Sequence, residues 1–483
     1  MSLNTLTPTS VAIIGAGPVG LAAAAHAIAR GLRPLIFEAG DAVGANLLEY
    51  GHVRLFSPFR YNVDRVMAGQ LASAGWTPPA ADELPLAREI VERVLMPFAQ
   101  LPAVRDGLQL GTRVISISRD GFDKVKTTGR DSAPFVIRVR QNGSVVERRA
   151  RAVIDASGTW NQPNPLGANG LPAIGERDLS GAIFYGIPDV LGRHRERYAG
   201  KRTLVVGAGH SAANALLALA DLAEQAGGTR LVWAVRSPSL QRVFGGGEAD
   251  ALPARGQLGA ALQALRDSGG LEFVGGLLIA SVRRDGKHIM VEGLDAAGQW
   301  TAVPGIDEIV CATGQRPDLT LSSELRLKLD PWLESTEALG PLIDPNIHSC
   351  ATVRPHGHRE LAHPETGYFT VGVKSYGRAP TFLMATGFEQ ARSVVAAIAG
   401  DLEAADQVEL ELPETGVCSA VGSPTEGSAE SARCGGPAKA GAAAAGCALD
   451  EEKKALRKSG CGCGASERPT PATTATPAAT TCC

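Results

Sequence analysis

Two glycine-rich motifs, each at the end of an apolar run, constrain this chain more than any other feature. The first reads VAIIGAGPVG and carries Gly15, Gly17 and Gly20. The second reads TLVVGAGHSA and carries Gly207, Gly209 and Ala212. In such motifs the first glycine makes the strand-to-helix turn, the second admits a pyrophosphate, and the third position lets helix and strand pack closely. The following helix points free N–H groups at the phosphates.

Taken together, the two motifs predict a chain that binds two dinucleotides. Glu38 follows the second apolar run of the first repeat, where a carboxylate accepts hydrogen bonds from a ribose hydroxyl and repels a 2′-phosphate. In the second repeat the run RLVWAV is followed by Arg236, whose guanidinium can pair with a 2′-phosphate. We therefore expect FAD at the first motif and NADPH at the second. A solvated surface role is the alternative for Arg236.

Length and composition are consistent with a chain of several domains. At 483 residues, of which 44% are hydrophobic, the chain can form two or three packed cores. We expect an α/β fold with two Rossmann-like domains, in which an NADPH-binding domain interrupts the FAD-binding domain. The expected FAD-binding parts are residues 1–160 and 305–411, and the NADPH-binding part is residues 161–304. Residues 412–483 are rich in Ala, Gly, Ser, Thr, Pro and Cys, which predicts a disordered tail.

Local patterns refine this division. Alternating and apolar runs between residues 112 and 156 predict a β-meander attached to the FAD domain, with a hairpin turn at 141–144. A helix is expected from about Pro380 to Ile398, with proline in its first turn and Gly400 after its end. We expect the start of that helix to face the flavin. The further residues expected to bind cofactor are Gly158, Thr313, Gly314, Gly372 and Thr381.

Charge and cysteine usage limit the partners and the compartment. A net charge of −3 gives no electrostatic reason to expect nucleic acid or an anionic membrane surface. The run from Val11 to Ala29 lacks a basic leading region and is broken by glycines and Pro18, so we expect neither a signal peptide nor a membrane span. Cysteine is absent before Cys311, which is typical of a reducing compartment. We therefore expect a cytoplasmic protein that acts on a small molecule.

From Val11 to about Gly400 the chain resembles the class B-type flavin monooxygenases. The resemblance rests on GAGPVG, Glu38, DASGTWNQPNP, GKRTLVVGAGHSA, CATGQRPD and GFEQAR, in that order. The segments GHVRLFSPFRYNVD, SGTW and HPETGYFTVGVKSYGRAPTFL, with GCGC in the tail, are also similar to flavoproteins found with arsenic-resistance genes. The chain departs from the class at its phenylalanine–glycine–histidine fingerprint, where Leu179, Gly181 and Tyr185 stand. The missing histidine argues against Baeyer–Villiger chemistry.

The resemblance implies a reaction. NADPH would reduce FAD, O2 would add at the flavin C4a position, and the hydroperoxide would oxygenate a soft nucleophile, with a trivalent arsenical as the candidate substrate. By the same analogy Arg54 and Ser57 line the reactive face of the flavin. Tyr185 stands at a position of the class fingerprint, so these three residues are the candidate catalytic residues. A structural ion-pair partner is the alternative role of Arg54.

Two other functions stay open. A flavoprotein reductase of disulfides or thiophilic metals passes electrons through a dithiol, and the tail offers Cys461, Cys463, Cys482 and Cys483. No cysteine pair in the first 310 residues could receive those electrons beside the flavin. Thiolates also prefer soft ions, so the four tail cysteines are a candidate metalloid site. The third hypothesis is a non-enzymatic, metalloid-binding flavoprotein, and a homodimer is open as well.

Overall fold

The first glycine motif lies inside a βαβ unit from which one half of the fold is built. The computed structural model describes residues 10–237, 240, 244, 252–347, 353–380 and 382–410, which all belong to one compact unit of the chain. Strand β1 (Ser10–Ile14) is buried along its whole length and leads into helix α1 (Pro18–Ala29). Strand β2 (Arg33–Phe37) then returns parallel to β1.

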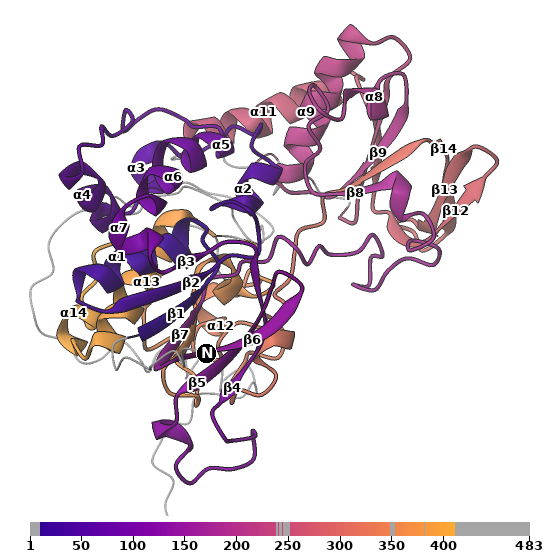
Figure 1. Ribbon diagram of the computed structural model, residues 1–483. Helices are drawn as coiled ribbons and strands as arrows, with labels where there is room; N and C mark the ends of the chain where they lie inside the picture. Colours follow the sequence, from indigo (N-terminus) through magenta and orange to yellow (C-terminus); the bar gives the residue numbers. More distant parts are fainter. Residues whose placement is uncertain are drawn as a thin grey trace, which may run out of the picture. The chain divides into compact units, whose positions relative to one another are not determined.

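Among the described residues the first sheet has five strands in the order β16-β7-β1-β2-β3, and all its pairings are parallel. The remaining strands are β3 (Leu108–Gln109), β7 (Ala152–Asp155) and β16 (Tyr368–Thr370). Because parallel strands end at the same edge, the segments after Ile14, Asp155 and Thr370 meet at the carboxyl edge of this sheet. Figure 1 shows β7, β1, β2 and β3 of this sheet side by side.

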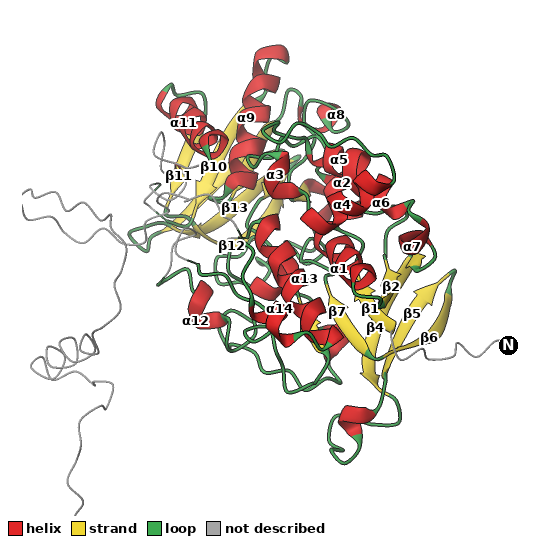
Figure 2. Cartoon of the chain, turned by 90° about the vertical axis from the view of Figure 1, so that its left-hand side faces the viewer, coloured by secondary structure: helices red, strands yellow, loops and turns green. Residues whose placement is uncertain are grey.

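Both faces of the first sheet are covered. Along β1, Val11 and Ile13 pack into a core with α1 and α13, whereas Ala12 and Ile14 pack into a second core with a β-meander. This alternation is the period of two that a strand imposes on its side chains. The helices that accompany this sheet are α2 (Ala45–Glu49), α3 (Phe59–Asn62), α4 (Arg65–Ser73), α5 (Ala87–Ile90), α6 (Met96–Ala99), α7 (Pro102–Arg105), α12 (Gly340–Ile343), α13 (Met384–Ala399) and α14 (Leu402–Asp406); Figure 2 shows most of them from the side.

The meander consists of strands β4 (Thr112–Arg119), β5 (Phe135–Gln141) and β6 (Ser144–Ala150), paired antiparallel. Its hairpin turn is confirmed, since Asn142 (φ 49°) and Gly143 (φ 76°) both take the left-handed conformation of a tight β-turn. The expected extent of the meander is wrong at its end. Residues 152–155 leave it as β7 and pair parallel with β1, because this short apolar strand is buried on both faces.

The expected C-terminal helix exists but begins later than the sequence suggested. Helix α13 starts at Met384, so Pro380 precedes the helix and is not in its first turn. Gly400 ends it with φ 89°, as expected of a glycine after a helix. The helix packs closely on α1, because a Cβ at Gly387 would stand 2.5 Å from Val19 Cγ2.

The second glycine motif opens a second parallel sheet. Its strands, in the order β11-β10-β9-β15-β8, are β11 (Glu272–Gly275), β10 (Arg230–Val235), β9 (Arg202–Val206), β15 (Glu308–Cys311) and β8 (Ile183–Tyr185). One face packs with helices α9 (His210–Gln225) and α11 (Pro253–Asp267). The other face packs with a meander of β12 (Leu278–Asp285), β13 (His288–Leu294) and β14 (Trp300–Ile306). The short helix α8 (Arg195–Tyr198) precedes β9.

The arrangement of the first sheet is thus repeated, and the fold class expected from the two motifs is confirmed. Strand pairing moves one expected limit. Residues 308–311 form β15, which lies between β9 and β8, whereas a domain limit at residue 305 would have assigned them to the first sheet. The single-turn or short irregular helical segments are Val91–Leu95, Arg130–Ser132, Ser180–Ala182, Thr320–Ser322 and Gly372–Tyr376.

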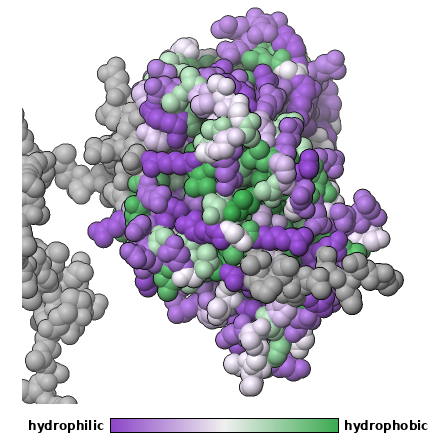
Figure 3. All heavy atoms as spheres, turned by 60° about the vertical axis from the view of Figure 1, so that its left-hand side comes forward, coloured by the Kyte–Doolittle hydropathy of each residue, from purple (hydrophilic) through white to green (hydrophobic). Residues whose placement is uncertain are grey.

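None of the described helices is long and apolar enough to cross a bilayer. On the face of the molecule drawn in Figure 3, hydrophobic groups gather near the middle and hydrophilic groups surround them. Such a mixture is ordinary on a folded domain, because polar side chains are too few to cover its surface.

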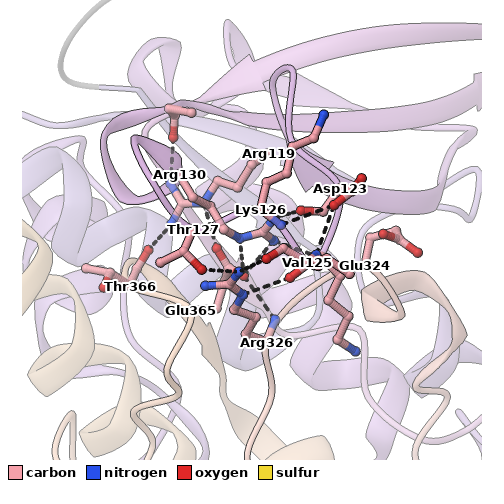
Figure 4. Close-up of polar contacts among 12 residues, drawn as sticks. Arg119, Asp123, Val125, Lys126, Thr127, Arg130, Glu324, Arg326, Glu365 and Thr366 are labelled. Carbon is pink, nitrogen blue, oxygen red and sulfur yellow. Dashed lines mark hydrogen bonds and ion pairs between the residues drawn. The ribbon is translucent and has the colours of Figure 1, made fainter. Parts of the chain in front are cut away.

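A buried cluster of charges joins the first meander to the chain near residue 365 (Figure 4). Glu365 accepts hydrogen bonds from Arg119 Nε at 2.7 Å and from Arg130 Nη2 at 2.8 Å, and all three side chains are buried. Arg119 also stacks on the ring of Phe135, 3.7 Å from its centre. Burial alone would raise the pKa of Glu365, but the hydrogen bonds from Arg130 and Arg119 outweigh it and hold that pKa below its usual value.

We predict that Glu365→Gln lowers the free energy of unfolding by about 3–5 kcal/mol at neutral pH, since it leaves two buried guanidinium groups without a counter-charge. The folded-state pKa of Glu365 is depressed, so the contribution is present above the unfolded pKa of about 4.3 and is lost as the pH falls through the lower folded value. Urea unfolding of both proteins over a pH series measures this. The difference in free energy of unfolding between the parent protein and Glu365→Gln should become smaller at acidic pH.

The matched control is Glu147→Gln, which breaks the exposed Arg138–Glu147 pair on the same meander. An exposed pair contributes about 0–1 kcal/mol, so this variant should unfold almost like the parent protein. Equal losses from the two substitutions would contradict the structural importance given to the buried cluster.

Candidate functional site

At the first motif, two of the three glycines are required by close packing, and the third faces open space. Gly15 has φ +97°, and a Cβ there would lie 2.7 Å from the carbonyl oxygen of Ala156. A Cβ at Gly20 would lie 2.0 Å from the carbonyl oxygen of Gly15. A Cβ at Gly17 would meet no described atom within 4 Å, and α1 begins there without a side-chain cap. The N-terminal donors of α1 therefore adjoin space that a phosphate could fill.

The second motif repeats this geometry. Gly207 has φ +139°, and a Cβ there would lie 2.2 Å from the carbonyl oxygen of Ala312. A Cβ at Gly209 would meet no described atom within 4 Å, and α9 also begins without a side-chain cap. Ala212 is fully buried where the helix packs on its sheet. Each motif thus combines a tight turn, a close helix–strand contact and an open helix N-terminus.

Glu38 lies immediately after β2 and already has two backbone partners. Its carboxylate accepts hydrogen bonds from Ala16 N at 2.7 Å and from Gly40 N at 2.8 Å, so it holds the glycine turn in place. An ionised carboxylate offers about four lone-pair sites, which leaves capacity for a ribose hydroxyl. Glu38 is therefore suited both to holding the glycine turn and to binding a ribose hydroxyl.

Two further glycines stand where the first sheet ends. Gly158 (φ +72°) lies three residues after β7, and a Cβ there would be 3.9 Å from Asn46 Nδ2 and from Val373 Cγ1. Gly372 (φ +72°) follows β16 and donates its N–H to Gln390 Oε1 at 2.7 Å. The sequence identified both glycines but gave no reason to single out Asn46, because that residue belongs to no motif.

The second half of the molecule contains the remaining described cofactor candidates. Arg236 follows β10, is exposed, and donates from Nη1 to the carbonyl oxygen of Ala168 at 3.2 Å. A guanidinium has five N–H donors, so this contact leaves others for a phosphate. Thr313 donates from Oγ1 to the carbonyl oxygen of Asn164 at 2.9 Å, and Gly314 takes φ +87° beside Asn164. These two residues close the turn after β15.

The candidate catalytic residues separate into two places. Arg54 and Ser57 lie on the segment between α2 and α3, whereas Tyr185 ends β8 in the second sheet. Arg54 is exposed and donates to the carbonyl oxygen of Leu84 at 2.5 Å. Ser57 is buried and donates from Oγ to Asn62 Oδ1 at 3.0 Å.

Tyr185 donates its hydroxyl to Glu176 Oε1 at 2.7 Å. Burial and this hydrogen bond raise the pKa of Tyr185 well above its usual value, so the phenol stays protonated at neutral pH. Glu176 also accepts hydrogen bonds from the backbone N–H groups of Leu166 and Ala173. Tyr185 therefore has a structural partner within the second half of the molecule.

A small pocket connects the segment of Ser57 with the start of α13. It is lined by Ser57, Tyr61, Asn62, Leu252, Leu383 and Met384. Leu252 immediately precedes α11, so the pocket lies where elements of the two halves approach each other. No group of three or more His, Cys, Asp or Glu side chains in the described part of the chain is arranged to hold a metal ion.

Direct contacts also join the two halves beside the second motif. Phe56 packs against His210, the first residue of α9, with ring centres 5.1 Å apart. Tyr50 packs against Trp160, the last residue of the first expected FAD-binding part, with ring centres 4.7 Å apart. Arg193 donates to the carbonyl oxygen of Glu49. The segment from α2 to Phe56 therefore adjoins the helix N-terminus at which the second phosphate group is expected, a closeness that the sequence did not reveal.

The described part of the chain offers one cysteine for redox chemistry, Cys311 at the end of β15. Burial raises the pKa of its thiol to about 12, so it is not a thiolate at neutral pH. Other residues of the sequence predictions lie outside the described residues: Thr381, Cys461, Cys463, Cys482 and Cys483.

Comparison with known proteins supports the first motif and the fold. Residues 13–68 match the family model described as an NAD(P)-binding Rossmann-like domain. Over 225 residues the chain is 33% identical to a ferredoxin–NADP reductase of Gluconacetobacter diazotrophicus, a match that covers 46% of this chain. It covers 52% of the relative, so the chain spans about half the length of that curated protein.

Two solved structures share the overall arrangement. One is the cadaverine monooxygenase DfoA of Erwinia amylovora, bound to FAD, with TM-score 0.58 and 15% identity over 88% of this chain and 100% of that one. The other is the bacillithiol disulfide reductase of Bacillus cereus, with TM-score 0.57 and 17% identity over 81% and 99%. At these identities the likeness establishes the fold alone. The chain therefore shares its two-sheet fold with these two proteins.

The contrast between Gly17 and Gly20 gives a test. We predict that Gly17→Ala changes the free energy of unfolding by less than about 0.5 kcal/mol, because its added methyl group meets open space at φ −78°. Gly20→Ala should destabilise the protein by about 1–3 kcal/mol or more, because its methyl group meets backbone. Chemical denaturation measures both. Dinucleotide binding should nevertheless be lost in Gly17→Ala, and tight binding by that variant would contradict a phosphate site there.

Proposed function

We propose that the chain is an FAD-dependent, NADPH-using monooxygenase that acts in the cytoplasm on a small, soft nucleophile. One observation carries the proposal: two open helix N-termini, at Gly17 and Gly209, stand at the carboxyl edges of two parallel sheets. The segment from Glu49 to Phe56 of the first half touches the second helix start at His210. Two dinucleotides in these places suit hydride transfer between their rings.

The residues present fit FAD at the first motif. The start of α1 would hold the pyrophosphate, Glu38 the ribose, and the Gly158 and Gly372 turns would adjoin the rest of the cofactor. When bound, the flavin supplies hydride acceptance and the activation of O2. We propose FAD-binding parts at residues 10–160 and 312–410 and an NADPH-binding part at 161–311, which follows the strand pairing.

The chain's own residues would position and shield the substrate. Arg54 and Ser57 precede α3, and Ser57 lines the pocket that includes Leu383 and Met384 beside the start of α13. Apolar walls exclude water and strengthen each polar contact inside. We propose that Arg54 and Ser57 contact the substrate and that Tyr185, whose hydroxyl is held by Glu176, is the third catalytic residue.

The finer proposal is that the substrate is a trivalent arsenical. It is supported by the resemblance to flavoproteins found with arsenic-resistance genes and by the affinity of thiolates for soft ions. Cys461, Cys463, Cys482 and Cys483 would capture the metalloid for the oxidising site.

A disulfide or metal reductase is the rival function, suggested by the fold shared with bacillithiol disulfide reductase. Such an enzyme needs a thiolate near the flavin. Cys311 is not a thiolate at neutral pH, because burial raises the pKa of its thiol to about 12. The described residues therefore favour the monooxygenase, and a tail dithiol is the remaining route to a reductase.

NADPH oxidation under air, with and without methylarsenite, separates the two functions. We expect stimulated turnover that consumes O2, yields oxidised arsenical and survives deletion of residues 412–483. Anaerobic turnover abolished by Cys482→Ser with Cys483→Ser would support the reductase instead. Bound FAD with no turnover in either assay would leave a binding protein.

Coenzyme choice provides a separate prediction. A charge-assisted hydrogen bond contributes about 1.5–3 kcal/mol, so Arg236→Ala should raise the Kd of NADPH roughly 10- to 100-fold and leave that of NADH nearly unchanged. Arg230→Ala is the matched control, since Arg230 is exposed at the opposite end of the same strand. Fluorescence titration with each coenzyme measures the effect. Parallel losses of NADPH and NADH affinity would contradict a 2′-phosphate contact.

A further inference from the structure

A buried pair of opposite charges lies at the carboxyl edge of the first sheet. The ammonium group of Lys374 is 2.7 Å from Asp155 Oδ2, and the two side chains are 1% and 0% exposed. Asp155 is the last residue of β7, and Lys374 follows β16 within the segment Gly372–Tyr376. The pair therefore links the ends of two neighbouring strands.

The pair extends into a hydrogen-bonded network that reaches the turn after β7. Lys374 Nζ also donates to Ser157 Oγ at 3.0 Å. Ser157 in turn donates to Asp155 Oδ1, from Oγ at 2.6 Å and from its backbone N at 3.1 Å. Tyr368 donates its hydroxyl to Asp155 Oδ2 at 3.1 Å. The contacts of Ser157 with Asp155 and Lys374 fix the path of the chain between Asp155 and Ser157, whereas Tyr368 contacts only the Asp155 side chain.

That path borders the first glycine motif. The carbonyl oxygen of Ala156 is the atom that leaves no room for a Cβ at Gly15. One residue beyond Ser157, the backbone of Gly158 takes φ +72° and stands opposite Asn46 and Val373. Asp155 is fully buried, whereas Ser157 and Gly158 are half-buried. The network thus runs from the core to the surface where the cofactor is proposed to lie.

Burial of a charge pair does not by itself indicate function. The Arg119–Glu365 pair is as deeply buried, yet it joins the meander to the chain near residues 326 and 365 and not to the glycine turn. Buried ion pairs also add little to stability, because the cost of desolvating the charges offsets their attraction. A pair of apolar residues in the same place often gives equal stability. What distinguishes Lys374 is its place at the carboxyl edge, behind a turn that faces the proposed cofactor.

We propose that Lys374 is a positioning residue of the flavin site. It acts through Asp155 and Ser157 to hold the Ser157–Gly158 backbone in the conformation that accepts the cofactor. This inference rests on the proposed function, because it requires FAD to bind at the first motif.

The test separates positioning from stability. Lys374→Met leaves Asp155 buried without a counter-charge and should lower stability. The double variant Lys374→Met with Asp155→Leu removes both charges and should recover much of that stability, but its turn lacks the polar network. We expect its Kd for FAD to remain about tenfold or more above that of the parent, as loss of one to two charge-assisted hydrogen bonds predicts. Fluorescence titration of apoprotein with FAD and urea unfolding supply the two readouts.

Three milder variants serve as controls. Ser157→Ala keeps the charge pair and should weaken FAD binding several-fold without a large loss of stability. Tyr368→Phe removes only the third contact to Asp155 and should bind FAD nearly as the parent does. Glu365→Gln should lower stability while leaving the Kd for FAD unchanged, because its cluster does not reach the turn.

The outcomes are distinguishable. If the double variant or Ser157→Ala binds FAD as tightly as the parent, Lys374 has a structural role and the inference is wrong, while the proposed function stands. If the parent itself binds no FAD, the proposed function fails and the inference fails with it. The inference is supported if the double variant and Ser157→Ala both bind FAD weakly while Glu365→Gln binds FAD as the parent does.

Discussion

The backbone crossing at the carboxyl edge of the first sheet is the constraint on which the rest of the structure depends. Gly15 turns the chain so tightly against Ala156 that a single carbon atom could not fit between them. Gly20 brings α1 so close to the turn that a Cβ there would lie 2.0 Å from the carbonyl oxygen of Gly15. Because of these contacts, the strands and α1 are closely packed, while the N-terminus of α1 at Gly17 faces open space. The sheet supplies the rigid support, and the exposed turn supplies the binding surface.

A tight glycine turn followed by an open helix N-terminus occurs in both halves of the molecule. This repetition gives the chain two places at which a nucleotide could bind. One glycine turn alone indicates a nucleotide site. A second turn, whose helix start at His210 contacts Phe56 of the first half, indicates that two nucleotides can work together. Glu38 accepts a hydrogen bond from the first turn at Ala16 N, and the Asp155–Lys374 pair holds the segment that begins at Asp155 and packs against Gly15. Such bracing suits a site whose geometry has to be held before the ligand arrives.

The sequence predicted the parts of the fold that depend on local geometry. The glycine turns, the strand before Glu38 and the hairpin at Asn142 follow from conformational rules that act over a few residues. It failed where the partner of a segment is distant. A short apolar run does not indicate which strand it will join, so the sequence places residues 152–155 in a meander and sets a domain limit at residue 305, before β15. The contacts of Lys374 and Glu365 span more than two hundred residues and leave no local pattern.

The central claim, that two dinucleotides meet ring to ring, is tested most directly by anaerobic mixing of the FAD-loaded protein with NADPH. We expect the visible absorbance of the flavin to disappear in a single saturable phase. The same amount of NADH should bleach the flavin more slowly. A protein that takes up FAD but keeps its colour in excess NADPH would contradict the claim.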